Sequence, residues 1–395
     1  MLFQALDDKE VCVGVYANDK FYFKKIPKNL TKTWSYSAFL KDKDVEYASL
    51  YCEGKSLEEV CPAYLKKDWD KVKDRLTAFY RAAAEVKLDL NMHCVHNVMP
   101  PHFLKELCRV KNKITQHVIT VHKKPTNYEQ LLSVTKVLTE IKNRKLNLDL
   151  NLLDDKRHEL KTRNFLKRMK NTLPYISYNL FGTKTGRLTT KKNSFPILTM
   201  NKNYRAILKP RNDWLVEFDY NAAELRVMLG LLGKNQPQED LHEWNLKNIY
   251  KELETRERAK KRIFAWLYNP ESNDTLSSEA YDRESIKKKY WDGKKVATIF
   301  NREIESDEHH AVNYIIQSTF ADLFLEQVVK VHNFLKGKKS FISFMVHDSL
   351  VVDLAEEERE ILPELKKILA ETSLGKFKIS LNAGKNFGAL KELKI

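Results

Sequence analysis

Two aspartates interrupt apolar segments that otherwise have the character of β-strands. "FMVHDSLVVDL" (344–354) carries Asp348 at its middle, and "WLVEFDYNAAELRVMLGLL" (214–232) begins as an apolar strand that ends at Asp219. Each Asp alone is more often a turn residue at a strand end. If the two strands are neighbours, however, both carboxylates meet at one point, where they repel each other unless a divalent cation lies between them. Mg²⁺ is the expected ion, and a pair of such ions favours attack of a hydroxyl on phosphorus.

A row of four residues on one predicted helix has a composition suited to a nucleoside triphosphate. In "ETRERAKKRIFAWLYNP" (254–270), Arg256, Lys260, Phe264 and Tyr268 follow one another at intervals of four, so they share one side of the helix. A cationic half followed by an aromatic half is unusual for a core-facing stripe. It suits phosphates bound by the cations and a sugar and base beside the rings.

The overall charge favours an anionic partner. The chain has 395 residues, with 69 Lys and Arg against 53 Asp and Glu, which gives a formal net charge of +16. Nucleic acid is the first candidate partner, although a Lys-rich surface that only maintains solubility explains the charge equally well. The length allows two or three domains and a large buried core.

The pattern of apolar residues, charges and turn residues changes along the chain. Residues 1 to about 110 mix short β-branched runs with a helical period, and the proline pair in "VMPPHF" (98–103) interrupts them. Residues 126–172 predict two strongly basic helices, whose cations alone indicate no more than a solvated face. From Pro174 onward, short strands, glycine-containing turns and helices alternate, and 269–295 is predicted to be an irregular connection.

Six motifs of the second half, in order, resemble the polymerase module of family A DNA polymerases, the DNA polymerase I family. They are TKTGRLTT (183–190), DYNAAELR (219–226), DLHEWNLKNIY (240–250), the R-x-x-x-K-x-x-x-F-x-x-x-Y row (256–268), NYIIQSTFADLF (313–324) and VHD (346–348). Any one of these matches could arise by chance, whereas six in the correct order are not plausibly accidental.

The resemblance implies an α+β right-hand fold of palm, fingers and thumb with an antiparallel palm sheet. It also implies a DNA-directed DNA polymerase, in which a primer 3′-hydroxyl attacks the α-phosphate of a dNTP near two Mg²⁺ ions and pyrophosphate leaves. The implied metal ligands are Asp219, Asp348 and the backbone carbonyl of Tyr220. The implied nucleotide-binding residues are His242, Arg256, Lys260, Phe264, Tyr268 and Glu224, with Lys260 also placed to neutralise or protonate pyrophosphate. The implied primer–template contacts are Arg187, Arg205, Asn313, Gln317 and His347.

Ser349 departs from the family pattern, which usually has Glu after H-D. The triplet H-D-S is typical of single-subunit phage-type RNA polymerases, which share this palm. Glu224 and Phe264 favour DNA synthesis, because bulk near the 2′ position of the sugar excludes a ribonucleotide. About 180 preceding residues also leave little room for a promoter-reading domain. An RNA polymerase-like enzyme remains the alternative.

A second alternative is a non-catalytic nucleic-acid-binding protein on a decayed polymerase scaffold. The intact acidic pair, Asp219 and Asp348, argues against it, as do Arg256 and Lys260 of the cationic row.

We expect three regions: a reduced α/β N-terminal domain (1–110), a helical thumb (111–180), and palm and fingers (181–395, with the fingers at about 235–300). The first is interpreted as an inactive exonuclease-like remnant or a cap. A proofreading exonuclease needs a D-x-E on an early strand, whereas Asp7, Asp8 and Glu10 lack that strand placement. No proofreading activity is therefore expected.

The remaining features predict a cytoplasmic protein. All five cysteines lie in the first third without a CxxC pair, which predicts free thiols in a reduced compartment. Neither a signal peptide nor a membrane-spanning segment is expected. Small size, abundant Lys and missing nuclease motifs resemble phage-encoded members, so a viral protein acting in a bacterial host, with unidentified replication partners, is expected.

Overall fold

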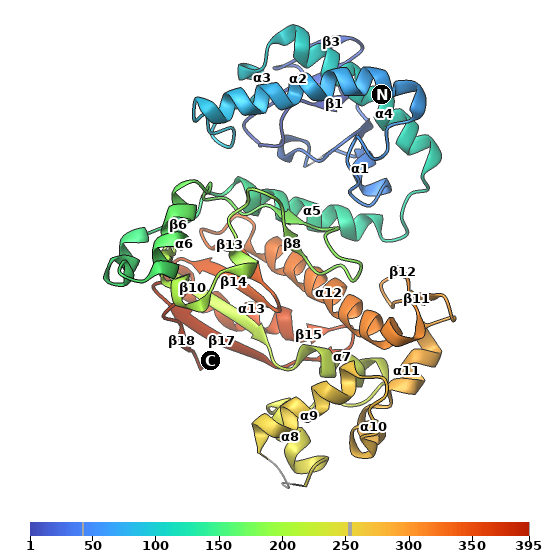
Figure 1. Cartoon of the computed structure of the whole chain (residues 1–395), viewed down its shortest axis with the longest axis vertical. Helices are drawn as coiled ribbons and strands as arrows, with labels where there is room; N and C mark the ends of the chain where they lie inside the picture. The colour runs from blue at the N-terminus through green and yellow to red at the C-terminus, as the bar shows by residue number, and fades with distance from the viewer. Residues whose placement is uncertain (42, 252–254, 395) are drawn as a thin grey trace. The chain divides into compact units, whose positions relative to one another are not determined.

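The computed structural model describes residues 1–41, 43–251 and 255–394, and the chain forms two compact units, Met1–Asn143 and Arg144–Ile395 (Figure 1). Each unit is described by itself. Among the described helices, none has both the length and the apolar composition needed to cross a membrane.

The first unit combines a small sheet with helices, as the sequence predicts. Strands β1 (Gln4–Ala5), β2 (Val15–Ala17) and β3 (Lys20–Tyr22) form an antiparallel sheet, and β4 (Lys32–Thr33) pairs in parallel with β5 (Glu46–Tyr47). Its helices are α1 (Ala48–Tyr51), α2 (Lys66–Glu85), α3 (Val95–Val98), α4 (Pro101–Val121) and α5 (Tyr128–Asn143), with short 3₁₀ turns η1 (Ala38–Leu40) and η2 (Ala63–Leu65).

The proline pair separates two helices of this unit. Helix α3 ends at Val98, and α4 begins at Pro101, because the first turn of a helix tolerates a residue without an N–H. Helix α4 then continues past residue 110, so the expected domain boundary at 110 lies inside a continuous helix. The range expected for the thumb, 111–180, is divided between the two units at Asn143.

The prediction of free thiols is wrong for two of the five cysteines. Cys12 and Cys94 form a disulfide, with their Cα atoms 5.4 Å apart. Cys52, Cys61 and Cys108 are free. The bonded pair is separated by 82 positions in the sequence, and spacing alone does not reveal which distant cysteines meet in the fold.

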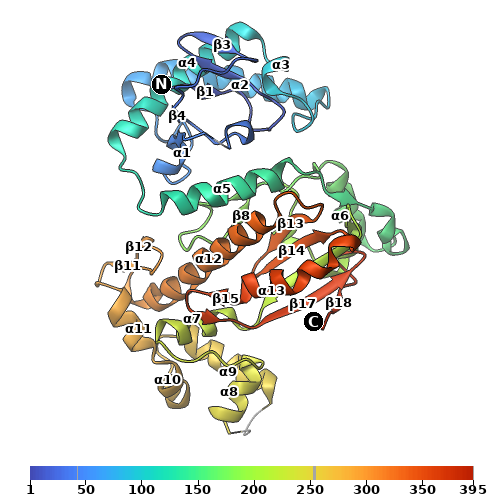
Figure 2. The same cartoon turned by 180° about the vertical axis from the view of Figure 1, so that it is seen from behind.

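The second unit is built on a five-stranded antiparallel sheet with the order β13-β14-β10-β17-β18 (Figures 1 and 2). The strands are β13 (Phe341–Val346), β14 (Ser349–Leu354), β10 (Trp214–Tyr220), β17 (Ile379–Gly384) and β18 (Lys391–Glu392). The antiparallel sheet predicted from the sequence is confirmed.

Side chains alternate along β10 between the two faces of this sheet, and their burial shows which face is covered. Val216, Phe218 and Tyr220 are buried on one face. The ring of Tyr220 contacts Phe320 and Phe324 of α12 (Glu308–Leu335), and its hydroxyl donates to the carbonyl of Leu369 in α13 (Leu362–Ala370). Helices α12 and α13 therefore cover the apolar face, and Figure 2 shows α13 lying across the sheet. The side chain of Asp219 projects from the opposite face.

A group of helices follows β10. They are α7 (Ala223–Leu231), α8 (Leu241–Asn248), α9 (Arg256–Tyr268), α10 (Thr275–Tyr281) and α11 (Arg283–Tyr290), followed by the antiparallel strands β11 (Lys295–Ala297) and β12 (Glu303–Glu305). The prediction that 269–295 is irregular is thus wrong. Asp274 and Asp282 are N-caps whose side chains accept backbone N–H groups at the starts of α10 and α11, a helix signal in the sequence that the polar composition obscured.

Short elements complete this unit. They are β6 (Asn147–Leu148) paired with β9 (Leu208–Lys209), η3 (Leu150–Lys156), α6 (Leu160–Lys170), β7 (Tyr178–Asn179) paired with β8 (Thr189–Thr190), η4 (Ile197–Thr199), η5 (Lys202–Ile207), η6 (Glu356–Ile361), and β15 (Glu371–Thr372) paired with β16 (Gly375–Lys376). The two helices predicted within 126–172 are α5 and α6, but only α6 is strongly basic, because α5 carries two Lys and two Glu.

Candidate catalytic site

The register of three strands brings Asp219 and Asp348 together. Asp348 belongs to a two-residue turn between β13 and β14, in which Val346 pairs with Ser349 and His347 has a left-handed backbone (φ +53°). On the other side of β14, Ser349 pairs with Asp219 of β10. The two carboxylates consequently lie at the same end of adjacent strands.

Burial and like charges act on both carboxylates. Burial raises the pKa of Asp219 to about 7, with further increases from the charges of Glu217 and Asp348, while Lys202 and Lys260 oppose the shift. Burial also raises the pKa of Asp348, against the influence of Arg187 and with that of Glu224. Both aspartates are thus less acidic than usual in the metal-free protein.

The two carboxylates fit a magnesium site that the protein completes only in part. Within the described chain, neither Asp219 nor Asp348 has a hydrogen bond or an ion pair to a side chain, so both retain free oxygens. The described His, Cys, Asp and Glu residues form no group of three arranged around one ion. Mg²⁺ suits such a site, because it is usually bound by one or two carboxylates and takes its remaining ligands from water and phosphate.

Helix α9 presents the predicted cationic and aromatic row away from its core face. Ala259, Ile263, Trp266 and Leu267 are its buried residues. The ring of Phe264 lies nearly parallel to that of Tyr268, with centroids 5.9 Å apart, and lies 5.7 Å from the ring of His242. Lys260 is exposed and has no hydrogen bond or ion pair to another described residue, but its charge acts on Asp219.

Arg256 and His242 are held at the start of α8. Arg256 donates two hydrogen bonds to Asp240, at 3.2 and 2.8 Å, and a third to Glu257 at 2.9 Å. His242 is buried, and its Nδ1 has no hydrogen-bond partner in the described chain. Burial lowers the pKa of His242 to about 4, in part opposed by Asp240, so this imidazole is neutral at pH 7.

Glu224 connects three segments of the site. Its Oε1 accepts a hydrogen bond from Arg187 at 2.5 Å, and its Oε2 accepts one from the Tyr268 hydroxyl. Glu224 is buried near the start of α7, and burial together with this carboxylate raises the pKa of Tyr268. The arrangement fixes the aromatic end of the α9 row against α7 and the 183–190 loop.

Arg226, two residues further along α7, positions α8. Its fully buried guanidinium donates to the carbonyls of Asn221, Pro237 and Glu239, at 2.8, 2.7 and 3.0 Å. These bonds hold the segment that leads to α8 against the end of β10. The buried Arg226 therefore fixes the start of α8, the helix that carries His242.

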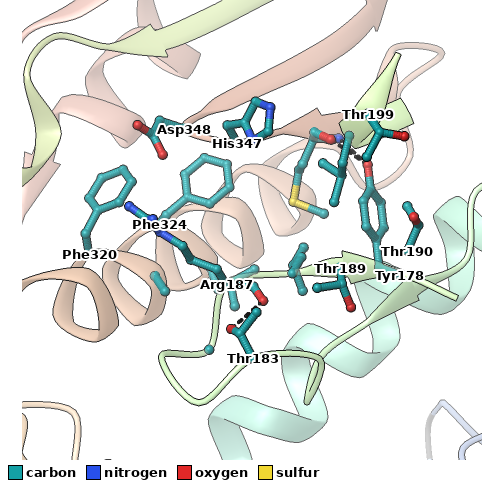
Figure 3. Close-up of a pocket in the computed structure, with 16 residues that line it drawn as sticks. Tyr178, Thr183, Arg187, Thr189, Thr190, Thr199, Phe320, Phe324, His347 and Asp348 are labelled. Atoms are coloured by element: carbon teal, nitrogen blue, oxygen red, sulfur yellow. Dashed lines mark hydrogen bonds between the residues drawn. The ribbon is translucent and has the colours of Figure 1, made fainter. Parts of the chain in front are cut away.

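A cavity of about 580 Å³ opens beside Asp348 (Figure 3). Arg187 and His347 line it together with Phe320 and Phe324 of α12. Of the other residues predicted to contact primer and template, Asn313 and Gln317 lie on the α12 row that continues into this lining, two turns and one turn before Ala321, respectively. Arg205 does not line the cavity.

Arg205 instead packs over the ring of Phe387, 4.7 Å from its centroid.

Sequence reasoning missed three charged residues of the site. They are Glu217, whose charge is the largest acting on Asp219, Lys202, which opposes it, and Asp240, which holds Arg256. Glu217 could have been found, because it precedes Asp219 by two positions and a strand places such residues on the same face. The contribution of Lys202 depends on the folding of η5 and has no local signal.

Comparison with known proteins shows which solved structures this fold resembles. No family model matches the chain. A stretch of 93 residues is 32% identical to part of the DNA polymerase I of Borreliella burgdorferi. This aligned stretch covers 22% of this chain and only 10% of that protein. The whole structure matches the POL domain of Pol1 from M. smegmatis, solved in complex with DNA primer-template and dNTP. That match has a TM-score of 0.64 at 12% identity and covers 98% of this chain and 95% of the other.

The fold is that of a DNA polymerase I-type polymerase domain. The right-hand polymerase fold expected from the sequence is confirmed, and its antiparallel sheet carries Asp219 and Asp348. Of the six motifs, DYNAAELR and VHD meet at one end of the sheet, and DLHEWNLKNIY and the R-x-x-x-K-x-x-x-F-x-x-x-Y row lie on α8 and α9, which follow β10.

Proposed function

We propose that the chain is a DNA-directed DNA polymerase of family A that uses two Mg²⁺ ions to extend a primer. The observation that carries the proposal is the pair Asp219 and Asp348, adjacent, unpaired among the described residues and close enough to Lys260 for its charge to act on Asp219. The polymerase fold and the row on α9 that is proposed to bind the triphosphate support the same assignment.

Asp219 and Asp348 would hold the metal ions, with the backbone carbonyl of Tyr220 as a further ligand. When bound, the ions supply activation of the attacking hydroxyl and stabilisation of charge on the transferred phosphate. Lys260 neutralises or protonates the departing pyrophosphate. Arg256 exchanges its bonds to Asp240 and Glu257 for phosphate oxygens, and neutral His242 donates a hydrogen bond to the same group.

The other named residues bind the base pair and the DNA. Phe264 and Tyr268 pack against the nascent pair, while Arg187, His347, Asn313, Gln317 and Arg205 contact primer and template. Helix α6 turns Lys161, Arg163, Lys167, Arg168 and Lys170 to solvent, opposite its buried side, which suits contact with duplex phosphates as part of a thumb. Helices α8 to α11 would form small fingers.

Sugar selection favours deoxynucleotides over the RNA polymerase alternative. Glu224 is buried, and its two oxygens are bonded to Arg187 and Tyr268, so it is a fixed obstacle beside the aromatic row. A fixed side chain excludes a 2′-hydroxyl more strongly than a mobile one.

We also propose that the first unit has no proofreading activity. Its early acids are engaged by their own unit: Asp7 accepts the Val95 N–H at 2.8 Å, Glu10 pairs with Lys41 at 2.6 Å, and Asp8 pairs with Lys142. Carboxylates engaged in this way are structural rather than poised for metal ions.

Primer extension tests the function. The protein is mixed with a labelled primer–template, Mg²⁺ and either dNTPs or NTPs, and compared with Asp219→Asn and with Glu357→Gln, which changes an exposed carboxylate of η6. We expect extension with dNTPs by wild type and E357Q, and a loss of about 10³-fold or more in D219N with duplex binding retained. Extension by D219N at the wild-type rate would falsify the metal assignment, and preferential use of NTPs would favour the RNA polymerase alternative.

A further inference from the structure

The carboxylate of Glu217 is held by the two strands on either side of β10. The Ser349 hydroxyl of β14 donates to its Oε1 at 3.2 Å, and the Asn382 side-chain amide of β17 donates to its Oε2 at 3.2 Å. The same hydroxyl lies 3.0 Å from the carbonyl of Val346, so its single proton is shared between the two acceptors. Glu217 is therefore oriented from both sides by neutral donors.

Glu217 and Asp219 leave the sheet on the same face. They are two positions apart on β10, so their side chains are neighbours separated by about 7 Å along the strand. Ser349 pairs with Asp219 and Asn382 pairs with Glu217, and directly paired residues of antiparallel strands also share a face. Since α12 and α13 cover the other face, these polar groups form one patch beside the proposed metal site.

The negative charge of Glu217 has no cationic partner in this patch. Within the described ranges, Glu217 makes neither an ion pair nor a hydrogen bond to Lys, Arg or His. Two neutral donors orient a carboxylate but do not balance its charge, and Asp219 and Asp348 nearby add to the negative potential. An arrangement of this kind is stabilised when a cation is present.

We propose that Glu217 is a positioning residue of the metal site, and that it supplies from β10 the acidic group that position 349 of β14 lacks. This inference rests on the proposed function. The described acids form no three-ligand set around one ion, so Glu217 acts through water: its oxygens accept hydrogen bonds from waters bound to the Mg²⁺ held by Asp219 and Asp348.

Ser349 has a matching role in this arrangement. It is the residue directly opposite Asp219, where the resembling family usually has Glu, but it carries no negative charge, and its hydroxyl donates to the Glu217 carboxylate. The two positions are thus interchangeable: an acid at 217 with Ser at 349, or an uncharged residue at 217 with an acid at 349, gives one extra carboxylate beside the pair.

Mn²⁺ binding without DNA or nucleotide provides a readout that is independent of turnover. Free Mn²⁺ is measured by electron paramagnetic resonance for wild type, Glu217→Gln, the double variant E217Q/S349E and the surface control E357Q. We expect E217Q to weaken binding by about 10- to 100-fold. The double variant should recover most of that loss, and E357Q should bind as wild type does. Melting temperatures establish that each variant is folded.

A milder variant separates orientation from charge. Ser349→Ala keeps the Glu217 carboxylate and removes one hydrogen bond to it, so it should weaken Mn²⁺ binding by less than E217Q does. A loss as large as that of E217Q overturns the assignment of the charge to Glu217. The same series in primer extension should show the Mg²⁺ concentration for half-maximal rate rising in E217Q and falling again in the double variant.

Two further outcomes overturn the inference. If E217Q binds Mn²⁺ with wild-type affinity, Glu217 has no role at the metal site. If E217Q/S349E stays as weak as E217Q, the two positions are not interchangeable. Both results leave the proposed function standing as long as wild type extends primers and D219N does not. A wild type that binds Mn²⁺ but extends no primer rejects the polymerase assignment itself.

Discussion

Asp219 lies directly opposite Ser349 in the pairing of β10 with β14, one residue away from Asp348. This register determines the site, because a slip of one residue would move Asp219 to the face covered by α12 and α13. The two-residue turn at His347 fixes where β14 begins and hence which residue meets Asp219. The alternation of apolar and acidic residues along β10 therefore serves both the core and the proposed metal site.

Lys260 and Lys261 are neighbours on α9 and provide a matched pair for testing the triphosphate row. Both are exposed, but they are turned about 100° from each other around the helix, and Lys260 belongs to the row with Arg256. Lys260→Ala should reduce the single-turnover rate of nucleotide addition by about 10²-fold or more, because a cation that neutralises or protonates the leaving group is lost. Lys261→Ala should change it by less than about twofold. Equal effects of the two substitutions would contradict the assigned row.

The raised pKa of Asp219 predicts a pH dependence of stability in the metal-free protein. The folded pKa of about 7 exceeds the ordinary value of 3.8, so the folded state binds the proton more tightly than the unfolded state. The resulting stabilisation is complete below pH 4 and is lost as the pH rises through 7. Thermal unfolding in EDTA should show the melting temperature of wild type falling relative to D219N across this interval. Parallel curves for the two proteins would show that Asp219 titrates normally.

The same proton competes with the metal. Since Mg²⁺ requires the ionised carboxylate, its binding should strengthen as the pH rises through 7, and proton release should accompany it. At low Mg²⁺ concentration the rate of primer extension should therefore rise through this pH range, and its midpoint should move to lower pH as Mg²⁺ increases. Rates are measured in single turnovers at fixed ionic strength. A midpoint that does not depend on Mg²⁺ would assign the titration to another group.

Glu224 should determine the choice between deoxyribose and ribose. Glu224→Ala removes a buried obstacle and should raise the use of ribonucleotides relative to deoxynucleotides by about 10- to 100-fold. It should also lower the efficiency with dNTPs, because Arg187 and Tyr268 lose their shared acceptor. Relative kcat/KM values for one dNTP and its NTP measure the effect. Tyr268→Phe, which keeps the ring and removes one hydrogen bond to Glu224, should give a smaller shift in the same direction.

The motifs that could be predicted from the sequence are those whose residue types and spacing are unusual within a single strand or helix. Asp219 and Asp348 are recognisable because acids rarely interrupt apolar strands, and the α9 row is recognisable because its spacing keeps four residues on one side of a helix. Asp240 was missed because its role depends on its pairing with Arg256 of the next helix. Glu217 could have been found from its spacing to Asp219, but its partners Ser349 and Asn382 lie far along the chain. Helices α10 and α11 were missed because polar composition outweighed the capping residues Asp274 and Asp282 in the interpretation.

The disulfide between Cys12 and Cys94 should stabilise the unit Met1–Asn143 without altering the residues proposed for catalysis. It joins positions 82 apart, and the chain-entropy description assigns roughly 4 kcal/mol to closing a loop of that length. The double variant C12S/C94S should therefore show faster amide hydrogen exchange throughout peptides of this unit, while peptides from β10 and β14 stay unchanged. Wild type in a reducing agent should behave like the double variant.

Cys61→Ser, which changes a free and half-buried thiol of the same unit, is the matched control and should exchange as wild type does. Exchange in C12S/C94S that equals that of C61S would show that the bond does not contribute to the stability of this unit.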